Sequence, residues 1–146
     1  MHINTTRFGK LAFEADDVLR FPAGLFGLED CRDWVLLADT DNPVVGWMQS
    51  TTRPEVAFAV VSPRRFVPRY QVRIGASELA PLGLERIAEA QVLAIVGRND
   101  RCMTLNLKAP LVINLERRVG RQVVNNSDQP LQHELEPYSV EMRKTA

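Results

Sequence analysis

MTLNLKAPLVINL, residues 103–115, is the stretch that decides the fold class. Apolar and polar residues alternate on both sides of Pro110, which is typical of strands that bury one face. Proline cannot donate to a strand ladder, so we expect Pro110 at a strand break, a bulge or a sheet edge. The alternation predicts four core side chains: Leu105, Leu107, Ile113 and Leu115.

Similar short runs, separated by turn residues, cover much of the remaining chain. They span residues 34–38, 44–49, 56–61, 70–74 and 91–97. After residue 115, a turn at Val119–Gly120 is expected to lead into a further strand. We predict an all-β, mainly antiparallel fold, a small β-barrel-like or sandwich domain. Helix is limited to one or two very short turns, near residues 77–79 and 84–88, because Pro81 and Gly83 interrupt them.

We assign residues 1–124 to this domain and residues 125–146 to a tail. The tail is polar, contains Pro130 and Pro137, and lacks a strong period, so we expect it to be peripheral or mobile. Three of its side chains remain candidates for docking onto the domain: Tyr138, Val140 and Met142.

Composition excludes several classes of protein. The 146 residues include 18 Lys and Arg and 18 Asp and Glu, so the net charge is zero. Nucleic-acid-binding domains usually carry a basic excess, and we therefore expect no direct nucleic-acid partner. The two cysteines do not form a disulfide framework, which favours a reducing cytoplasm. No apolar run approaches the ~18 residues of a membrane span, so we expect no membrane partner.

The segment FPAGLFGLED, residues 21–30, resembles a phosphate-binding loop only in its glycines. It lacks the lysine and hydroxyl residue of a P-loop and the spacing of a dinucleotide fingerprint, and its acids would repel phosphate. We interpret it as a structural elbow that ends a strand at Phe21. Pro22 fixes the backbone there, while Gly24 and Gly27 permit left-handed turns.

The same segment is also a candidate surface for a protein partner. Leu25 and Phe26 are large apolar groups in a loop, and such groups must either pack or meet a partner. Residues 14–41 hold eight acids and two arginines, a net charge of −6. The acids proposed for partner binding are Glu14, Asp16, Asp17, Glu29 and Asp30.

The residues give little support for catalysis, cofactor binding or a metal site. His2 and His133 lie near the ends of the chain, and spacings typical of metal ligands are absent. Cys31 and Cys102 are expected to be small buried hydrophobes. We therefore predict a protein that is not an enzyme and needs no cofactor; an active site assembled from scattered acids is the weaker alternative.

A second alternative is direct RNA binding through RRFVPRYQVR, residues 64–73. Arginines alternate there with aromatic residues, as in stacking platforms for single strands. The candidate residues are Arg64, Arg65, Phe66, Arg69 and Tyr70. A solvated strand face with one core aromatic explains the same run and agrees better with the neutral net charge.

Taken together, several stretches resemble the flagellar assembly factor family FliW. They are INTTRFG (3–9), FPAGLFGLE (21–29), WMQS (47–50), VAFAVVSP (56–63), NLKAPLVIN (106–114) and GRQVV (120–124), in the order of that family. The family loop usually reads FPxGIPGFE, so Phe26 and Leu28 depart from it. The resemblance assigns structural roles to Phe21, Pro22, Gly24, Gly27, Asn106, Pro110 and Asn114.

The resemblance implies a cytoplasmic binding protein with a small β-barrel-like fold. Proteins of this family bind newly made flagellin and, alternatively, the dimeric RNA-binding regulator CsrA, which represses flagellin translation. The expected partners are therefore flagellin and a CsrA-like regulator. An acidic surface on residues 14–41 would be attracted to the basic surface that an RNA-binding regulator must carry.

Overall fold

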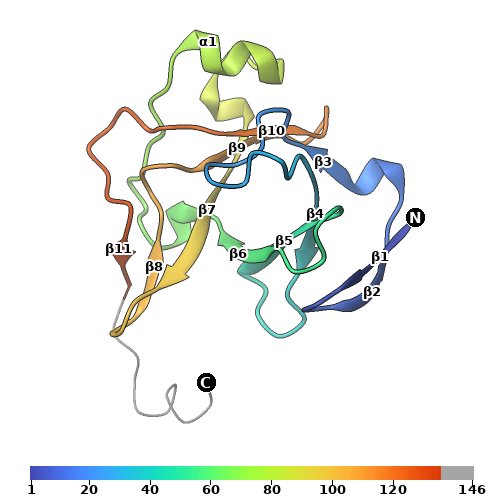
Figure 1. Cartoon of the computed structure of the whole chain (residues 1–146). Helices are drawn as coiled ribbons and strands as arrows, with labels where there is room; N and C mark the ends of the chain where they lie inside the picture. Colours follow the sequence, from blue (N-terminus) through green and yellow to red (C-terminus); the bar gives the residue numbers. More distant parts are fainter. Residues whose placement is uncertain (136–146) are drawn as a thin grey trace.

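The computed structural model describes residues 1–135, and residues 136–146 lie outside it. Seven strands form a closed ring in the order β7, β6, β5, β4, β3, β10, β9 and back to β7 (Figure 1). Every pairing in the ring is antiparallel except β3 with β10. The all-β barrel prediction is thus confirmed. Its strands are β3 Val18–Arg20, β4 Asp33–Ala38, β5 Val45–Ser50, β6 Ala57–Val61, β7 Gln91–Arg98, β9 Leu111–Asn114 and β10 Val119–Gln122.

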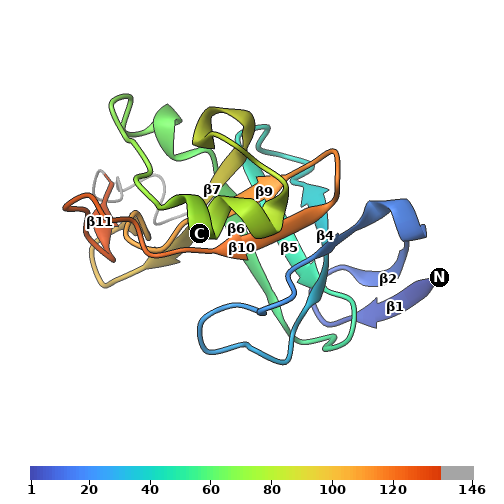
Figure 2. The same ribbon diagram turned by 90° about the horizontal axis from the view of Figure 1, so that it is seen from above.

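Smaller elements surround the ring. The hairpin of β1 (His2–Thr5) and β2 (Gly9–Ala12) lies outside it (Figures 1 and 2). β8 (Met103–Leu105) extends the far end of β7, and β11 (His133–Glu134) pairs with β8. Helix is limited to single turns, as expected, although there are more of them: α1 Ala76–Leu79 and the 3-10 turns η1 Ala15–Asp17, η2 Pro63–Arg65, η3 Ala80–Leu82 and η4 Ile87–Glu89.

The stretch 103–115 enters the core, with one correction. Leu105, Leu107 and Ile113 are completely buried, but the side chain of Leu115 is 43% exposed. All four residues of β9 are buried, so the burial does not alternate there. The chain leaves the barrel after Asn114, and Leu115 therefore lies in a turn instead of the core.

Pro110 lies between β8 and β9, at the strand break that its missing donor predicts. Both asparagines of this motif close turns: Asn106 Oδ1 accepts from the Ala109 N–H (2.9 Å), and Asn114 Oδ1 accepts from the Arg117 N–H (3.2 Å). Asn114 Nδ2 also donates to the Leu82 carbonyl (2.9 Å). The expected turn at Val119–Gly120 is wrong, because both residues belong to β10.

Residues 70–74 do not form the expected strand. Their burial alternates, with Tyr70 and Val72 inside, but this segment pairs with no strand of residues 1–135. Its backbone is instead held by Asn125, which accepts from the Arg73 N–H (2.9 Å) and donates to the Gln71 carbonyl (2.9 Å). Alternation predicted the burial correctly, but it could not show which group satisfies the backbone.

The expectation of a peripheral tail needs correction for residues 125–135. Asn125 is completely buried, β11 pairs with β8, and Leu135 packs against the core. The remaining tail residues, including Tyr138, Val140 and Met142, lie outside the described residues. Within residues 1–135, helices are too short to span a bilayer.

The ring is weakest where β3 meets β10. These parallel strands share a single residue pair, Val119 with Arg20, and the Arg20 N–H donates to the Arg118 carbonyl (2.9 Å). Beyond that pair the strands separate, and residues 21–31 leave the sheet as a loop (Figure 2). We call residues 21–31 the elbow loop.

Candidate partner-binding surface

The elbow loop is built by its own backbone hydrogen bonds. The Gly24 N–H donates to the Phe21 carbonyl (2.8 Å), which closes a first turn. Leu25 and Leu28 then exchange hydrogen bonds of 3.2 and 2.8 Å, so that Phe26 and Gly27 form the tip of a miniature hairpin. The segment is therefore a defined structure, as the elbow interpretation predicted.

Both glycines have the left-handed conformation expected from the sequence, with φ of 68° at Gly24 and 84° at Gly27. Gly24 also lies against the returning chain, because a Cβ atom there would be 2.5 Å from the Glu29 Cα. A Cβ atom at Gly27 would meet nothing within 4 Å. Gly24 is thus required for close approach as well as for its backbone angles.

The base of the elbow loop is anchored in the barrel. Phe21 is buried, and its ring packs so closely on Gly120 of β10 that a Cβ there would be 2.5 Å away. Leu25 is also buried, so it is a core residue and does not lie on the surface proposed for a partner. Of the two apolar candidates, only Phe26 is available to another protein.

Gln122 fixes the tip of the elbow loop. Its Oε1 accepts from the Phe26 N–H (2.8 Å), and its Nε2 donates to the Ala109 carbonyl (3.1 Å). The Phe26 side chain remains 58% exposed. The sequence reasoning did not identify Gln122; a polar residue between apolar neighbours in GRQVV is the signal that could have revealed it.

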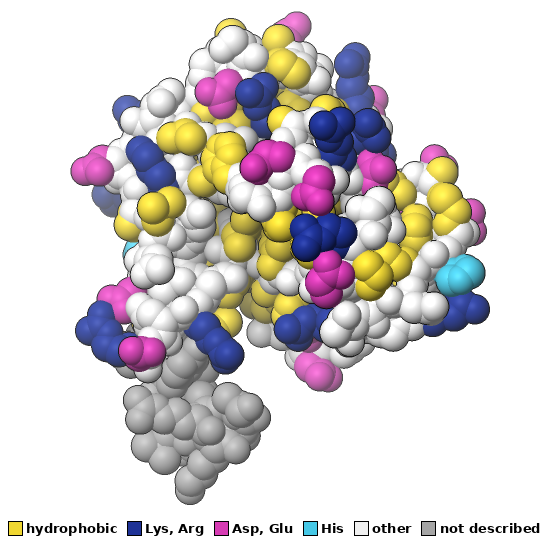
Figure 3. Space-filling view, viewed as in Figure 1, with side chains coloured by type: hydrophobic (Ala, Val, Ile, Leu, Met, Phe, Trp, Pro, Cys, Tyr) yellow, Lys and Arg dark blue, Asp and Glu magenta, His cyan; other side chains and the backbone are white. Residues whose placement is uncertain are grey.

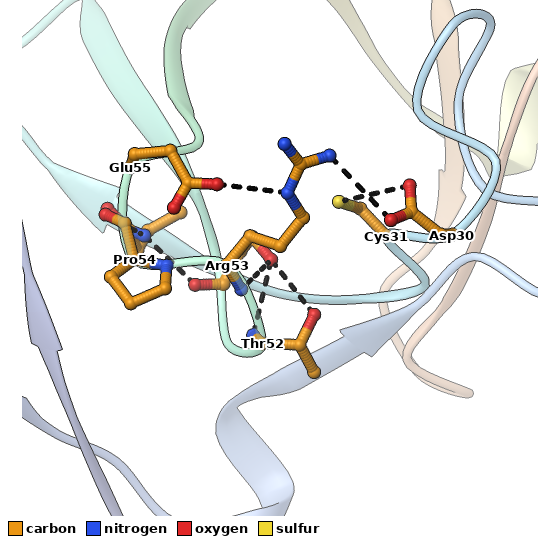
Figure 4. Close-up of polar contacts among 8 residues, drawn as sticks. Asp30, Cys31, Thr52, Arg53, Pro54 and Glu55 are labelled. Atoms are coloured by element: carbon orange, nitrogen blue, oxygen red, sulfur yellow. Dashed lines mark hydrogen bonds and ion pairs between the residues drawn. The ribbon is translucent and has the colours of Figure 1, made fainter.

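Arg53 joins the elbow loop to the turn between β5 and β6. Figure 4 shows its guanidinium between two carboxylates, with Nε 2.9 Å from Glu55 and Nη1 3.7 Å from Asp30. The pKa of Glu55 is lowered, first because the backbone N–H of Glu55 donates to its carboxylate and second because the Arg53 side chain does so too. Because all three side chains are largely exposed, this pairing stabilises the fold little. It does place a positive charge beside Asp30.

The acids at the other candidate positions are exposed but do not form a purely acidic surface. Asp16 and Asp17 belong to η1 and Glu14 precedes it. The Glu14 N–H donates to Asp17 Oδ2 (2.8 Å). Two arginines from outside residues 14–41 lie beside the candidate acids: Arg118 donates to the Asp17 carbonyl (2.8 Å), and Arg53 lies 3.7 Å from Asp30. Acidic and basic side chains lie interleaved on the face seen in Figure 3. Folding therefore dilutes the charge of −6 counted along residues 14–41.

The aromatic residues of the basic run do not form a stacking pair. Tyr70 is buried, and its hydroxyl donates to the Leu107 carbonyl (2.7 Å), whereas Phe66 is 39% exposed. Burial raises the pKa of Tyr70. One aromatic and several arginines remain on the surface, which is a poor platform for successive bases.

The remaining candidates for chemistry are scattered. Cys31 and Cys102 are free and buried, as expected for small hydrophobes. His2 is exposed in β1, while His133 lies in β11. Residues 1–135 contain no cluster of three or more His, Cys, Asp or Glu side chains that could hold a metal ion.

The family model described as "FliW protein" matches residues 2–135, almost the whole described chain. The chain belongs to the FliW family. The flagellar assembly factor FliW of Bdellovibrio bacteriovorus is 40% identical over 126 residues, which are 85% of this chain and 72% of that protein. The FliW of Leptospira interrogans is 33% identical over 131 residues, 88% and 87% of the two chains.

A solved structure supports the same assignment. The crystal structure of a flagellar assembly factor FliW superimposes with a TM-score of 0.86 at 27% identity, covering 96% of this chain and all of the other. The FliW fold thus includes both the ring of strands and the segments that surround it.

Proposed function

We propose that this chain is a non-enzymatic flagellar assembly factor of the cytoplasm. In this proposal it binds flagellin and, in competition, a CsrA-like regulator, whose repression of flagellin synthesis it relieves. Membership of the FliW family supports the proposal, because the relatives are named flagellar assembly factors. The resemblance of the sequence motifs to that family supports the choice of partners.

The observation that carries the binding role is the exposed Phe26 on a loop that is fixed on both sides. The elbow loop closes on itself through Leu25 and Leu28, and Gln122 holds the Phe26 backbone. An apolar side chain on a rigid support binds with little loss of conformational entropy. Buried aromatic anchors commonly dominate the energy of protein interfaces. We therefore assign Phe26 as the anchor for one of the two partners.

Exposed acids, Glu29 in the loop of this anchor and Asp16 in η1, add a second, electrostatic contribution. Glu29 follows Phe26 in the elbow loop and has no ion pair within residues 1–135, whereas Asp30 shares Arg53. A regulator that binds RNA must present basic surface. Glu29, together with Asp16 of η1, would speed the encounter with such a surface, an effect that salt screens beyond ~8 Å.

The proposal is tested by surface-plasmon kinetics with purified flagellin and a CsrA-like dimer from the same cell. Phe26→Ala should weaken binding of at least one partner by roughly tenfold or more, the usual effect of losing an anchor. Leu131→Ala is the matched control, because Leu131 is as exposed as Phe26 (63%) but lies outside both the elbow loop and residues 62–74. Unchanged binding of both partners by Phe26→Ala would remove the elbow loop from the interface.

Competition and charge are tested separately. Flagellin titrated into a preformed complex should release the CsrA-like protein; failure to do so would contradict the proposed switch. The double variant Asp16→Lys and Glu29→Lys should slow association more than it speeds dissociation, and increasingly so at low salt. Glu85→Lys with Glu116→Lys, two other exposed acids, provides the control. Equal association rates for both double variants would exclude steering by the proposed acids.

A further inference from the structure

A groove lies on the barrel beside the basic run, in a part of the chain that the proposed function does not use. It has a volume of about 450 Å³. One wall comes from residues 62–64 and 70–72, and the other from residues 87, 88 and 90–92. The second wall offers apolar side chains from η4 and the start of β7: Ile87, Ala88, Ala90 and Val92.

The start of β7 presents an open strand edge to this groove. β6 pairs with β7 at Val60–Ile95 and Val61–Ala94, and two residues further on the same register would bring Pro63 opposite Val92. Pro63 has no N–H, and its carbonyl already accepts from Phe66 (3.1 Å) and Val67 (2.9 Å) in the turn of η2. The chain therefore leaves the sheet before it can pair with Val92.

The backbone groups of Val92 point toward that open side. Antiparallel strands direct the N–H and C=O of successive residues to opposite neighbours. The Ile95 carbonyl accepts from the Asn106 N–H (3.0 Å), on the side of β7 that faces away from β6. Leu93 shares the direction of Ile95, so the N–H and C=O of Val92 face the groove. A strand edge of this kind can pair with an extended peptide.

One residue that lines the groove, Arg64, is basic, and the same segment of the chain carries three further arginines outside the lining. Arg64, Arg65, Arg69 and Arg73 are exposed, and none forms an ion pair within residues 1–135. Residues 56–77 contain no acid; the next acid along the chain is Glu78, in α1. Arg64 lines the groove, where its Nε donates to the Tyr70 carbonyl (3.0 Å). Asn125 holds the backbone on both sides of Val72, so the wall is fixed before any partner arrives.

We propose that this groove binds an extended, acidic segment of a partner protein, which adds as a short strand to the Val92 edge of β7. Its backbone would pair with Val92, its acidic side chains would face the arginines, and alternate apolar side chains would contact Ile87 and Ala90. A peptide fits better than RNA, because the open groups are those of a strand edge and Tyr70 cannot stack with a base.

A fluorescent ten-residue peptide of alternating valine and glutamate tests the charge preference by anisotropy on the full chain. It should bind at least tenfold more tightly than the matching valine–lysine peptide. Arg64→Glu with Arg69→Glu should weaken its binding by about tenfold, since each reversal replaces an attraction with a repulsion. The control is Arg32→Glu with Arg98→Glu, which should leave the binding of this peptide unchanged. Both arginines are exposed, lie outside the groove and belong to no ion pair of residues 1–135. Equal affinity for both peptides, or equal loss in both double variants, overturns the proposal.

Strand addition is tested by modifying the peptide, which leaves the protein intact. N-methylation removes one backbone donor at a time. Because the open edge consists of one residue, Val92, methylation should abolish binding at the peptide position that pairs with it and be tolerated at the two neighbouring positions. Loss at every position, or at none, would contradict strand pairing. A ten-nucleotide oligouridine is added as competitor. If it displaces the peptide at a lower concentration than unlabelled peptide does, the groove is a nucleic-acid site and the proposal fails.

Discussion

The elbow loop and residues 62–74 are two irregular segments of one barrel, but they are stabilised in different ways. Within the elbow loop, Gly24 donates to Phe21 and Leu25 exchanges hydrogen bonds with Leu28, so most partners lie within a few residues; the distant Gln122 adds one bond, to the Phe26 N–H. The second segment depends on Asn125, which is about fifty residues away and buried. Local turns thus supply most backbone bonds of the elbow loop, whereas the backbone of residues 71–73 relies on one distant polar side chain.

The difference separates the surfaces that the two segments present. The elbow loop exposes an apolar tip, Phe26, whereas residues 62–74 expose arginines beside an open strand edge. If both proposals hold, one barrel binds two kinds of partner at two sites. Changes that loosen one segment should then leave the other intact, and the following predictions test this independence.

The largest effect is expected at Asn125. Asn125→Ala leaves the part-buried Arg73 N–H without its acceptor, removes the donor to the buried Tyr70 hydroxyl, and leaves the Gln71 carbonyl with only the longer bond from Ser127 Oγ (3.4 Å). The free energy of unfolding should fall by roughly 3 kcal/mol, because each unsatisfied buried group costs about 1–3 kcal/mol. Asn126→Ala is the control: that side chain is exposed, and its bond to Arg73 uses only the backbone. Equal denaturation midpoints for the two variants would show that Asn125 does not hold this segment.

A smaller loss is expected from Gly24→Ala in the elbow loop. The new Cβ would add a clash with the Glu29 backbone to the cost of a positive φ, for a total of about 2–3 kcal/mol. Gly27→Ala has the same unfavourable φ without the clash, and should cost about 1 kcal/mol. Thermal or urea melts compare the two. If Gly27→Ala is the more damaging, the close approach at Gly24 is not what makes glycine necessary.

The smallest effect concerns pH. The pKa of Glu55 lies below its ordinary value of 4.5, so its attraction to Arg53 is complete above that pH and is lost as the pH falls through the lowered pKa. The Arg53 Nε resonance should therefore shift on acidification from pH 7 toward pH 3. The Arg64 Nε resonance should stay in place, since its acceptor is the Tyr70 carbonyl, which does not titrate. Parallel shifts of both resonances would indicate a general change in the fold.

The same contrast explains what could be predicted from the sequence. Strand alternation and the positions of Pro110, Gly24 and Gly27 predicted the barrel and the elbow loop, because those signals act over a few residues. The irregular course of residues 70–74 could not be predicted, since it depends on the distant Asn125. The charge of −6 on residues 14–41 was misleading for a similar reason: Arg53, from outside that range, lies beside Asp30. The burial of Leu25 also requires the folded barrel, because sequence alone does not show which apolar residue of a loop turns inward.

The single parallel pair between β3 and β10 has a consequence for the time course of folding. Most neighbours in the ring are joined by short connections and can pair early, but Arg20 must wait for Val119 to be synthesised and positioned. Contacts this distant along the chain slow folding, because a large loop must close before they stabilise anything. Until then the elbow loop has no Gly120 to cover Phe21 and no Gln122 to hold Phe26. The surface proposed for a partner is therefore assembled last, and an incompletely folded chain should be unable to bind through it.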